Sequence, residues 1–446
     1  MRNNASRLLL AGTGSGCGKT TVTTALLRAL QRRGVPLAAF KCGPDYIDPM
    51  FHTEALGVSS RNLDLFFVDE TEACGQLARH VPADGVGIIE GAMGFYDGVS
   101  GNTDTASAAH LARATDTPVV LIVRPRGQSL SLAAEIKGFR DFAPNTLAGV
   151  ILNGVSAGMY SYYRAIAEQA GLPVFGFLPP VPEAEIPDRH LGLVTAAEIK
   201  DLPDKLDRLA DAAETALDLD GLLVLARTAT PLADEAAPLM AVTDKPVRIA
   251  VARDQAFCFY YADNFDVLHQ LGAELVPFSP LNDEKLPEGI DGLYLGGGYP
   301  EVHAAQLAAN RTMRDSIRDA VLGGLPTIAE CGGFLYLHRT LDGAEMAGVI
   351  DVDANLTQKL QPFGYVTLTA RRDNLLCRAG EQIRAHEFHY AASSDAGMDF
   401  DAKKPNGRAW ACVHASDTLY AGFPHLYFRA NLAFAENFVR RCAQKG

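Results

Sequence analysis

The chain has 446 residues, more than a single hydrophobic core usually supports, so its length predicts two large domains. Its 40 lysines and arginines against 53 aspartates and glutamates give a net charge of −13, and no basic run appears, which argues against a nucleic-acid partner. No apolar run approaches the roughly 20 residues that span a bilayer, and no signal peptide precedes the first apolar segment. We therefore expect no membrane association and a cytoplasmic location, where eight cysteines without Cys-x-x-Cys spacing would stay reduced.

Short apolar strands alternate with helical segments through the first half of the chain, which predicts a parallel sheet covered by helices on both faces. A helix is predicted over Leu206–Leu217, and a polar, Ala- and Pro-rich stretch follows it. We expect the first domain to cover residues 1–228 and a linker to cover 229–246. The predicted strands are Leu8–Ala11, Leu37–Cys42, Val86–Glu90, Pro118–Val123, Ala148–Asn153 and Val174–Leu178.

A second alternation of strands and helices fills residues 247–446 and predicts a second domain, so the expected fold is α/β with two doubly wound domains. The segment Gln361–Thr369 and later ones suggest additional antiparallel strands. The predicted parallel strands are Val247–Val251, Glu274–Phe278, Gly292–Leu295 and Pro326–Ala329.

The segment Leu8–Thr21 runs from an apolar strand into a glycine-rich turn ending in Gly-Lys-Thr-Thr, which is typical of a phosphate-binding loop. Thr13 stands where the strict pattern has glycine, with Gly12 one place earlier. In such a loop, backbone N–H groups surround the phosphates, Lys19 reaches the outer ones and the Thr20 hydroxyl ligates Mg²⁺. The residues predicted to bind ATP are Gly14, Ser15, Gly16, Cys17, Gly18, Lys19, Thr20 and Thr21, together with Lys41.

Acidic residues follow the next two predicted strands, at the sheet edge where parallel α/β proteins bind ligands. Asp45 and Asp48 come after one strand, and Glu90 and Asp97 come with the next. Carboxylates beside a triphosphate can hold Mg²⁺, so we expect Thr20, Asp48 and Glu90 to bind the metal. The alternative is that these acids cap turns, which is the commonest role of aspartate in loops.

A cysteine flanked by glycines follows a strand in the second domain. Cys331 in Pro326–Phe334 fits a nucleophile on a sharp strand-to-helix turn, whose next backbone N–H faces a developing oxyanion. We expect Gly297, Gly298 and Gly332 to form the oxyanion site. The alternative is a buried cysteine that only packs. On spacing alone, His386, His389 and His425 are comparable candidates for the base.

The chain resembles the cobyrinate a,c-diamide synthases over essentially its whole length. The motifs that carry the resemblance are the variant phosphate loop, Lys41–His52 (KCGPDYIDPMFH), Glu90–Gly98 (EGAMGFYDG), Arg189–Leu193 (RHLGL), Ala256–Tyr261 (AFCFYY), Leu295–Glu301 (LGGGYPE), Glu330–Gly333 and His386–Tyr390 (HEFHY). The resemblance implies an amino-terminal domain similar to dethiobiotin synthetase and a carboxy-terminal class I glutamine amidotransferase domain of the cobyric acid synthase type.

The resemblance also implies the roles of particular residues. The nucleophile maps to Cys331 and its base to His425, whereas usual class I glutaminases carry a glutamate where Tyr427 stands, so the third group is unidentified. Ammonia released from glutamine would move to the first domain, where ATP·Mg²⁺ phosphorylates the c and then the a acetate of cobyrinic acid. Asp45, Tyr46, Ile47 and Asp97 would lie beside the acetate, and a homodimer is a further expectation.

Three alternatives stay open at this point. The same chemistry on Ni-sirohydrochlorin needs a closely similar chain, whereas cobyric acid synthases lack the Lys41–His52 and Glu90–Gly98 contexts. A partitioning or switch ATPase also uses a variant phosphate loop, but it has no use for a glutaminase cysteine such as Cys331. Release of glutamate from glutamine would separate an amidating enzyme from such an ATPase.

Overall fold

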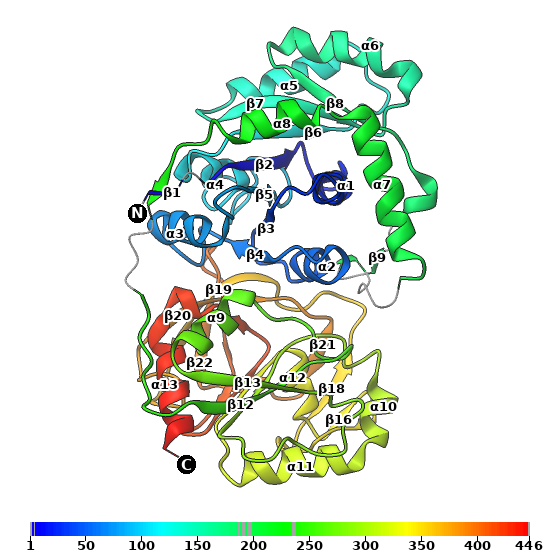
Figure 1. Ribbon diagram of the computed structural model, residues 1–446. Coiled ribbons are helices and arrows are strands. Elements are labelled where there is room, and N and C mark those ends of the chain that lie inside the picture. The colour runs from blue at the N-terminus through cyan, green and yellow to red at the C-terminus, as the bar shows by residue number, and fades with distance from the viewer. Residues whose placement is uncertain are drawn as a thin grey trace. The chain divides into compact units, whose positions relative to one another are not determined.

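The computed structural model describes residues 2–3, 5–185, 188–189, 192–193, 199–233 and 238–444. The chain divides into two compact units, Met1–Ala236 and Ala237–Gly446, which Figure 1 shows in blue to green and in green to red. Residues 234–237 of the predicted linker, and His190 and Leu191 of the motif Arg189–Leu193, lie outside the described residues. Among the helices of the described part, none is both long and apolar enough to cross a bilayer.

The first unit is built on a parallel sheet in which every neighbouring pair of strands is parallel. Its strands, in spatial order, are β4 (Ser60–Leu63), β3 (Leu37–Cys42), β5 (Val86–Glu90), β2 (Arg7–Gly12), β6 (Val119–Val123), β7 (Leu147–Asn153) and β8 (Val174–Leu178). The six strands predicted from the sequence are all present, with ends that differ by at most a residue. Only β4 was missed, because the polar edge strand Ser-Arg-Asn-Leu carries no apolar run.

Helices cover both faces of this sheet, as the alternating pattern predicted. Figure 1 shows α1 and α7 on one side of the central strands and α3 and α4 on the other. The ion pairs Arg28–Asp207 (2.8 Å) and Arg32–Asp211 (2.7 Å) link α1 to α7. The helices are α1 (Lys19–Arg32), α2 (Ile47–Leu56), α3 (Glu70–His80), α4 (Ala108–Ala114), α5 (Ser131–Asp141), α6 (Ala157–Ala167), α7 (Leu202–Ala216) and α8 (Leu219–Ala226).

Short segments complete the first unit. It has two antiparallel strand pairs, β1 (Arg2–Asn3) with β11 (Leu232–Ala233) and β9 (Asp188–Arg189) with β10 (Gly192–Leu193). It also has two 3₁₀ turns, η1 (Glu168–Ala170) and η2 (Pro182–Ala184).

The second unit contains a six-stranded sheet whose inner strands are parallel. Its spatial order is β13 (Ala273–Phe278), β12 (Val247–Ala252), β14 (Gly292–Leu295), β15 (Thr327–Glu330), β25 (Leu419–Gly422) and β24 (His414–Ala415), and β24 alone of these runs antiparallel to its neighbour. The four predicted parallel strands are therefore neighbours in one sheet. The helices are α9 (Ala262–Gln270), α10 (Ala304–Ala309), α11 (Arg311–Leu322), α12 (Gly332–Tyr336) and α13 (Leu432–Ala443), with a 3₁₀ turn η4 (Phe428–Ala430).

The second unit has two further sheets, one of which is antiparallel at every pair of strands, as expected for the region after Gln361, whereas the other is mixed, because β16 and β18 run parallel. One sheet has the order β23 (Ala409–Cys412), β22 (Phe400–Lys403), β19 (Gly364–Ala370), β20 (Gln382–Glu387) and β26 (His425–Leu426). The other has the order β17 (Ala344–Glu345), β16 (Thr340–Leu341), β18 (Asp353–Leu356) and β21 (Ala391–Ser393). The pairing of β26 with β20 places His425 opposite His386.

The phosphate-loop turn between β2 and α1 closes only because glycine stands at two positions. A Cβ on Gly12 would lie 2.3 Å from Cys17 Sγ. Gly18, the N-cap of α1, has a φ of 95°, and a Cβ there would lie 1.9 Å from Asn153 Nδ2. That Asn153 amide donates a 2.8 Å hydrogen bond to the Cys17 carbonyl, so the end of β7 fixes the loop.

We expect Gly18→Ala to lower the melting temperature of the protein, because alanine is strained by about 1–2 kcal/mol at this φ and its Cβ would displace Asn153. Gly138→Ala is the matched control, since Gly138 lies in α5 with open space around its Cα. That substitution should leave stability equal or raise it by up to about 1 kcal/mol. Differential scanning calorimetry of both variants checks this, and equal melting of Gly18→Ala and the parent protein would contradict it.

Candidate active sites

The phosphate loop of the first unit presents its backbone and two functional side chains at the carboxyl edge of the sheet. Ser15 and Gly16 are exposed, whereas Lys19 is buried. Lys19 Nζ donates hydrogen bonds to the carbonyls of Gly14 (3.0 Å) and Met93 (2.6 Å), and burial lowers the pKa of Lys19. The ammonium therefore lies across the loop, where it can reach a phosphate.

A buried cluster connects this loop to the ends of β3 and β5. Thr20 Oγ1 donates a 2.7 Å hydrogen bond to Glu90 Oε1, and Lys41 Nζ donates a 2.9 Å bond to the same oxygen. Lys41 also bonds to Asp48 and lies 4.0 Å from Asp45 Oδ2. The structure thus brings together Thr20, Lys41, Asp48 and Glu90, which the sequence assigned to one site.

The charges of this cluster follow from burial and from Lys41. Burial opposes the charge of Lys41, but the surrounding carboxylates outweigh it and raise its pKa well above the usual value. Burial likewise opposes ionisation of Asp48, yet the Lys41 ammonium lowers its pKa to about 2. Burial raises the pKa of Glu90 despite the attraction of Lys41. Lys41 therefore holds the cluster in a charged, hydrogen-bonded state that an apolar interior alone would not tolerate.

The other predicted residues of the first unit lie around this cluster in different ways. Asp45, which is partly exposed, accepts a 2.9 Å hydrogen bond from Ile47 N, and desolvation together with Asp48 raises its pKa to about 7. The side chains of Tyr46 and Ile47 are buried at the start of α2. Asp97 is exposed and accepts a 2.7 Å bond from Gly94 N, which is a turn-capping contact. Among the described residues, no contact joins Asp97 to the Lys41 cluster.

His52 was quoted within a motif but was given no role from the sequence. It is fully buried on α2, and its Nε2 lies 3.7 Å from Glu90 Oε2. Burial lowers the pKa of His52 to about 4, so the imidazole is neutral near pH 7. A polar residue at the end of an apolar strand, Asn153, was also missed, although its position was a signal that could have identified it.

Cys331 occupies a strained backbone turn at the end of β15 in the second unit. Its φ of 48° and ψ of −100° are unusual for a residue with a Cβ and cost on the order of 1–3 kcal/mol. Bonds from Cys331 N to Gly422 O and from Gly333 N to Gly296 O, both 2.8 Å, hold the turn. Burial raises the pKa of the Cys331 thiol, so a base is needed to activate it.

Glycines surround the turn, as the sequence predicted. A Cβ on Gly332 would lie 3.0 Å from Gly298 N, and the Gly332 backbone N–H bonds to the Cys331 sulfur. A Cβ on Gly297 would lie 2.4 Å from His425 Cε1 and 3.0 Å from Nε2. Gly297 is therefore the residue that lets the His425 ring approach this loop, and Gly298 and Gly332 lie side by side.

Two of the three candidate histidines, His389 and His425, differ in what their ring nitrogens contact. His389 contacts Ala391 O through Nδ1 (2.6 Å) and Glu387 Oε1 through Nε2 (2.9 Å), so both of its nitrogens are engaged. Its ring also stacks on Phe423. His425 turns its ring edge, Cε1 and Nε2, toward Gly297, and its Nδ1 lies 3.8 Å from Glu330 Oε2. Of these two, His425 is the one whose ring lies against the glycine loop beside the cysteine turn.

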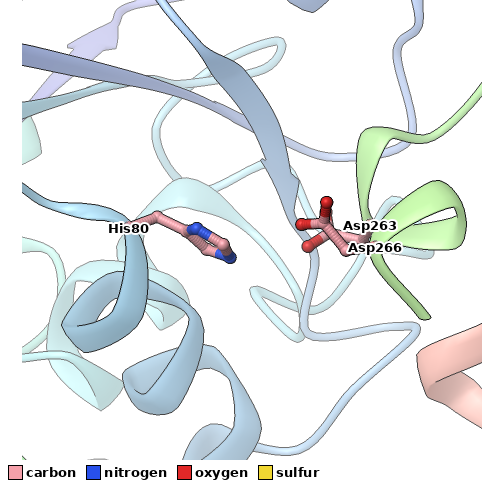
Figure 2. Close-up of side chains that lie close together, drawn as sticks. All are labelled: His80, Asp263 and Asp266. Carbon is pink, nitrogen blue, oxygen red and sulfur yellow. The ribbon is translucent and has the colours of Figure 1, made fainter. Parts of the chain in front are cut away.

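Figure 2 draws three further side chains that could suggest a metal site. His80 ends α3 in the first unit, whereas Asp263 and Asp266 lie on α9 in the second. Within its own unit, Asp263 lies 3.8 Å from the Arg429 guanidinium. The three residues belong to different units, and neither unit supplies a three-ligand site from them.

Comparison with known proteins identifies the domain family of each unit. Residues 8–194 match the CobQ/CobB/MinD/ParA nucleotide binding domain, and residues 248–433 match the CobB/CobQ-like glutamine amidotransferase domain. Both domain matches contain the catalytic motifs described above.

Curated relatives match along nearly their whole length. A cobyrinate a,c-diamide synthase of Thermoplasma volcanium is 41% identical over 450 residues, which cover 98% of this chain and 97% of the relative. Those of Methanothermobacter thermautotrophicus and Clostridium acetobutylicum are 41% and 39% identical, each covering 97% of this chain and 99% of the relative. With this identity across both units, the chain belongs to the cobyrinate a,c-diamide synthase family.

Proposed function

We propose that this protein uses ATP and glutamine to convert the a and c acetate carboxylates of cobyrinic acid to amides. The observation that carries the proposal is the contact of the phosphate loop, through Thr20, with the Glu90 oxygen that also holds Lys41. This arrangement suits phosphoryl transfer to a carboxylate, and the cysteine turn of the second unit suits release of ammonia from glutamine.

In the second unit, the Cys331 sulfur attacks the side-chain amide carbon of glutamine. The thiol and His425 are both neutral at rest, because burial raises the pKa of Cys331 and lowers that of His425 to about 3. The thiol proton therefore passes to His425 as the sulfur–carbon bond forms, and His425 then gives this proton to the amide nitrogen, which leaves as ammonia. Backbone N–H groups of Gly298 and Gly332 face the developing oxyanion, and water hydrolyses the thioester to glutamate.

In the first unit, a carboxylate oxygen of the substrate attacks the terminal phosphorus of ATP, and ADP leaves. The product is an acyl phosphate, from which ammonia displaces phosphate to form the amide. Lys19 and Lys41 neutralise charge on the phosphates, so catalysis consists mainly of positioning and electrostatic stabilisation. Asp45, Tyr46 and Ile47 lie at the start of α2 beside the cluster, and together with Asp97 they are our candidates for contacts with the acetate.

The donors in the first unit fit a magnesium ion. Thr20, Asp48 and Glu90 offer one hydroxyl and two buried carboxylates, the hard oxygen ligands that Mg²⁺ prefers. When bound, the ion supplies positive charge that neutralises phosphate oxygens. We assign these three residues to hold it.

Other expectations from the sequence remain predictions. The relatives reported above are named for cobyrinate, so Ni-sirohydrochlorin as substrate is not favoured. All eight cysteines are free thiols, which supports our inference of a cytoplasmic location. A homodimer is also inferred, and analytical ultracentrifugation would test it.

We expect Glu90→Gln to reduce amide formation at least about 100-fold, because the change removes a buried anionic ligand and weakens the hold on Lys41 and Thr20. The loss should be the same with glutamine or ammonium as nitrogen source, while glutamine hydrolysis persists. Glu168→Gln is the control, since Glu168 forms an exposed ion pair with Arg164. Liquid chromatography of the corrinoid products measures the effect. Ligation at the parent rate in Glu90→Gln would contradict a role in metal binding and would favour the alternative that Glu90 is only structural.

The proposed function is tested by changing the nitrogen source. Cys331→Ser should abolish amidation of cobyrinic acid with glutamine and preserve it with ammonium, because the cysteine only supplies ammonia. Cys377→Ser is the matched control, because the serine hydroxyl can replace the thiol as donor to Asn374, and it should behave like the parent protein. Equal loss with both nitrogen sources would refute the division of labour, and turnover of Ni-sirohydrochlorin without any corrinoid would refute the substrate.

A further inference from the structure

A buried glutamate lies directly before the cysteine of the second unit and is unused in the mechanism above. Glu330 is the last residue of β15 and only 2% exposed. Its Oε1 accepts a 2.9 Å hydrogen bond from Leu426 N, and its Oε2 accepts a 3.0 Å bond from the Tyr294 hydroxyl. The carboxyl is therefore fixed by two neighbouring elements, β26 and β14.

The same carboxyl faces the histidine that serves as base. Glu330 Oε2 lies 3.8 Å from His425 Nδ1, and the edge of the same ring formed by Cε1 and Nε2 faces Gly297. This separation is longer than a hydrogen bond, but such contacts are often long before substrate binds and shorten in the reacting complex.

A tyrosine occupies the position where class I glutaminases usually carry the glutamate that is their third catalytic group. Tyr427 stands two residues after His425, and its buried ring packs edge-on against Tyr261 at 5.1 Å. A phenol packed in this way offers no negative charge to an imidazolium. Glu330 offers a carboxyl from another strand at the corresponding nitrogen.

We propose that Glu330 is the missing third group of the glutaminase centre, orienting His425 through Nδ1 and balancing the positive charge that His425 takes from Cys331. The inference rests on the proposed roles of Cys331 and His425. Glu330 is a positioning residue, since it acts through His425 and not on glutamine itself. Tyr294 and Leu426 N in turn fix the carboxyl, in the manner of the supporting contacts that orient other catalytic histidines.

Other titratable groups near this pair must be considered in any pH experiment. Burial keeps the nearby phenols neutral by raising the pKa of each one. The groups that act electrostatically on Glu330, His425 or Cys331 are Tyr260, Tyr294, Tyr420, Glu301, Glu387, His386 and His389.

Steady-state glutamine hydrolysis by three variants of the full chain tests the proposal. Measured above pH 8, where the Glu330 carboxylate is ionised, Glu330→Gln should lower kcat at least about 100-fold with little change in KM, because it removes the charge but nothing that contacts glutamine. Tyr294→Phe should lower kcat to an intermediate value, since Glu330 loses one of its two donors. Tyr336→Phe is the matched control: it removes another buried phenol, which ends α12 and forms no hydrogen bond with a described residue, and it should leave kcat unchanged.

The pH profile adds a measurement that a purely structural role would not change. Burial raises the pKa of Glu330 to about 8, so kcat of the parent protein should rise as pH passes that value and the carboxylate forms. Glu330→Gln should lose this rise. If Glu330→Gln does not fold, Tyr294→Phe should shift the midpoint of the rise upward, because a donor to the carboxylate is lost.

The outcomes separate this proposal from the proposed function. Parent-like kcat in Glu330→Gln, an effect on KM alone, or an unchanged pH rise would overturn the role of Glu330. If instead the parent protein does not hydrolyse glutamine, or if Cys331→Ser still does, the glutaminase function itself fails. Ammonium-dependent amidation at the parent rate in each variant confirms that the chain has folded.

Discussion

A buried glutamate that ends a central parallel strand is the constraint around which each unit is organised. Glu90 ends β5 and Glu330 ends β15, and both are almost wholly removed from water. A carboxyl in that position is costly unless donors reach it from neighbouring elements. The donors are Lys41 and Thr20 in the first unit, and Leu426 N and Tyr294 in the second. Satisfying the carboxyl therefore draws the functional segments together.

The carboxyl groups of Glu90 and Glu330 have different neighbours, and their chemistry differs for that reason. Lys41 gives the first cluster a fixed positive charge, which suits a site for phosphates and a metal ion. Among the described residues, the hydrogen-bond donors to Glu330 are a phenol and a backbone amide, neither of which is charged. Burial therefore raises the pKa of Glu330, and its charge matters most when His425 becomes cationic. The same local device thus serves electrostatic neutralisation in one unit and orientation of a base in the other.

Much of this arrangement could be predicted from the sequence, since the strands of both parallel sheets are apolar runs bounded by turn residues. The phosphate loop, Lys41, Asp48, Glu90 and Cys331 could be placed because functional residues follow strand ends in such sheets. The edge strand β4 was missed for want of an apolar run. The contacts of Asn153 and Glu330 were missed for another reason. Each contact depends on which strands are neighbours in the sheet, and the pattern of apolar residues within a segment does not reveal the order of the strands.

The central claim is that the Glu90 cluster activates a carboxylate by transferring a phosphoryl group to it. The most direct measurement uses cobyrinic acid labelled with ¹⁸O in its acetate carboxyls, with ATP and glutamine, and follows the label in inorganic phosphate by mass spectrometry. If an acyl phosphate forms, one carboxyl oxygen leaves with phosphate for every amide made. The account predicts that stoichiometry, and amide formation with unlabelled phosphate would contradict it.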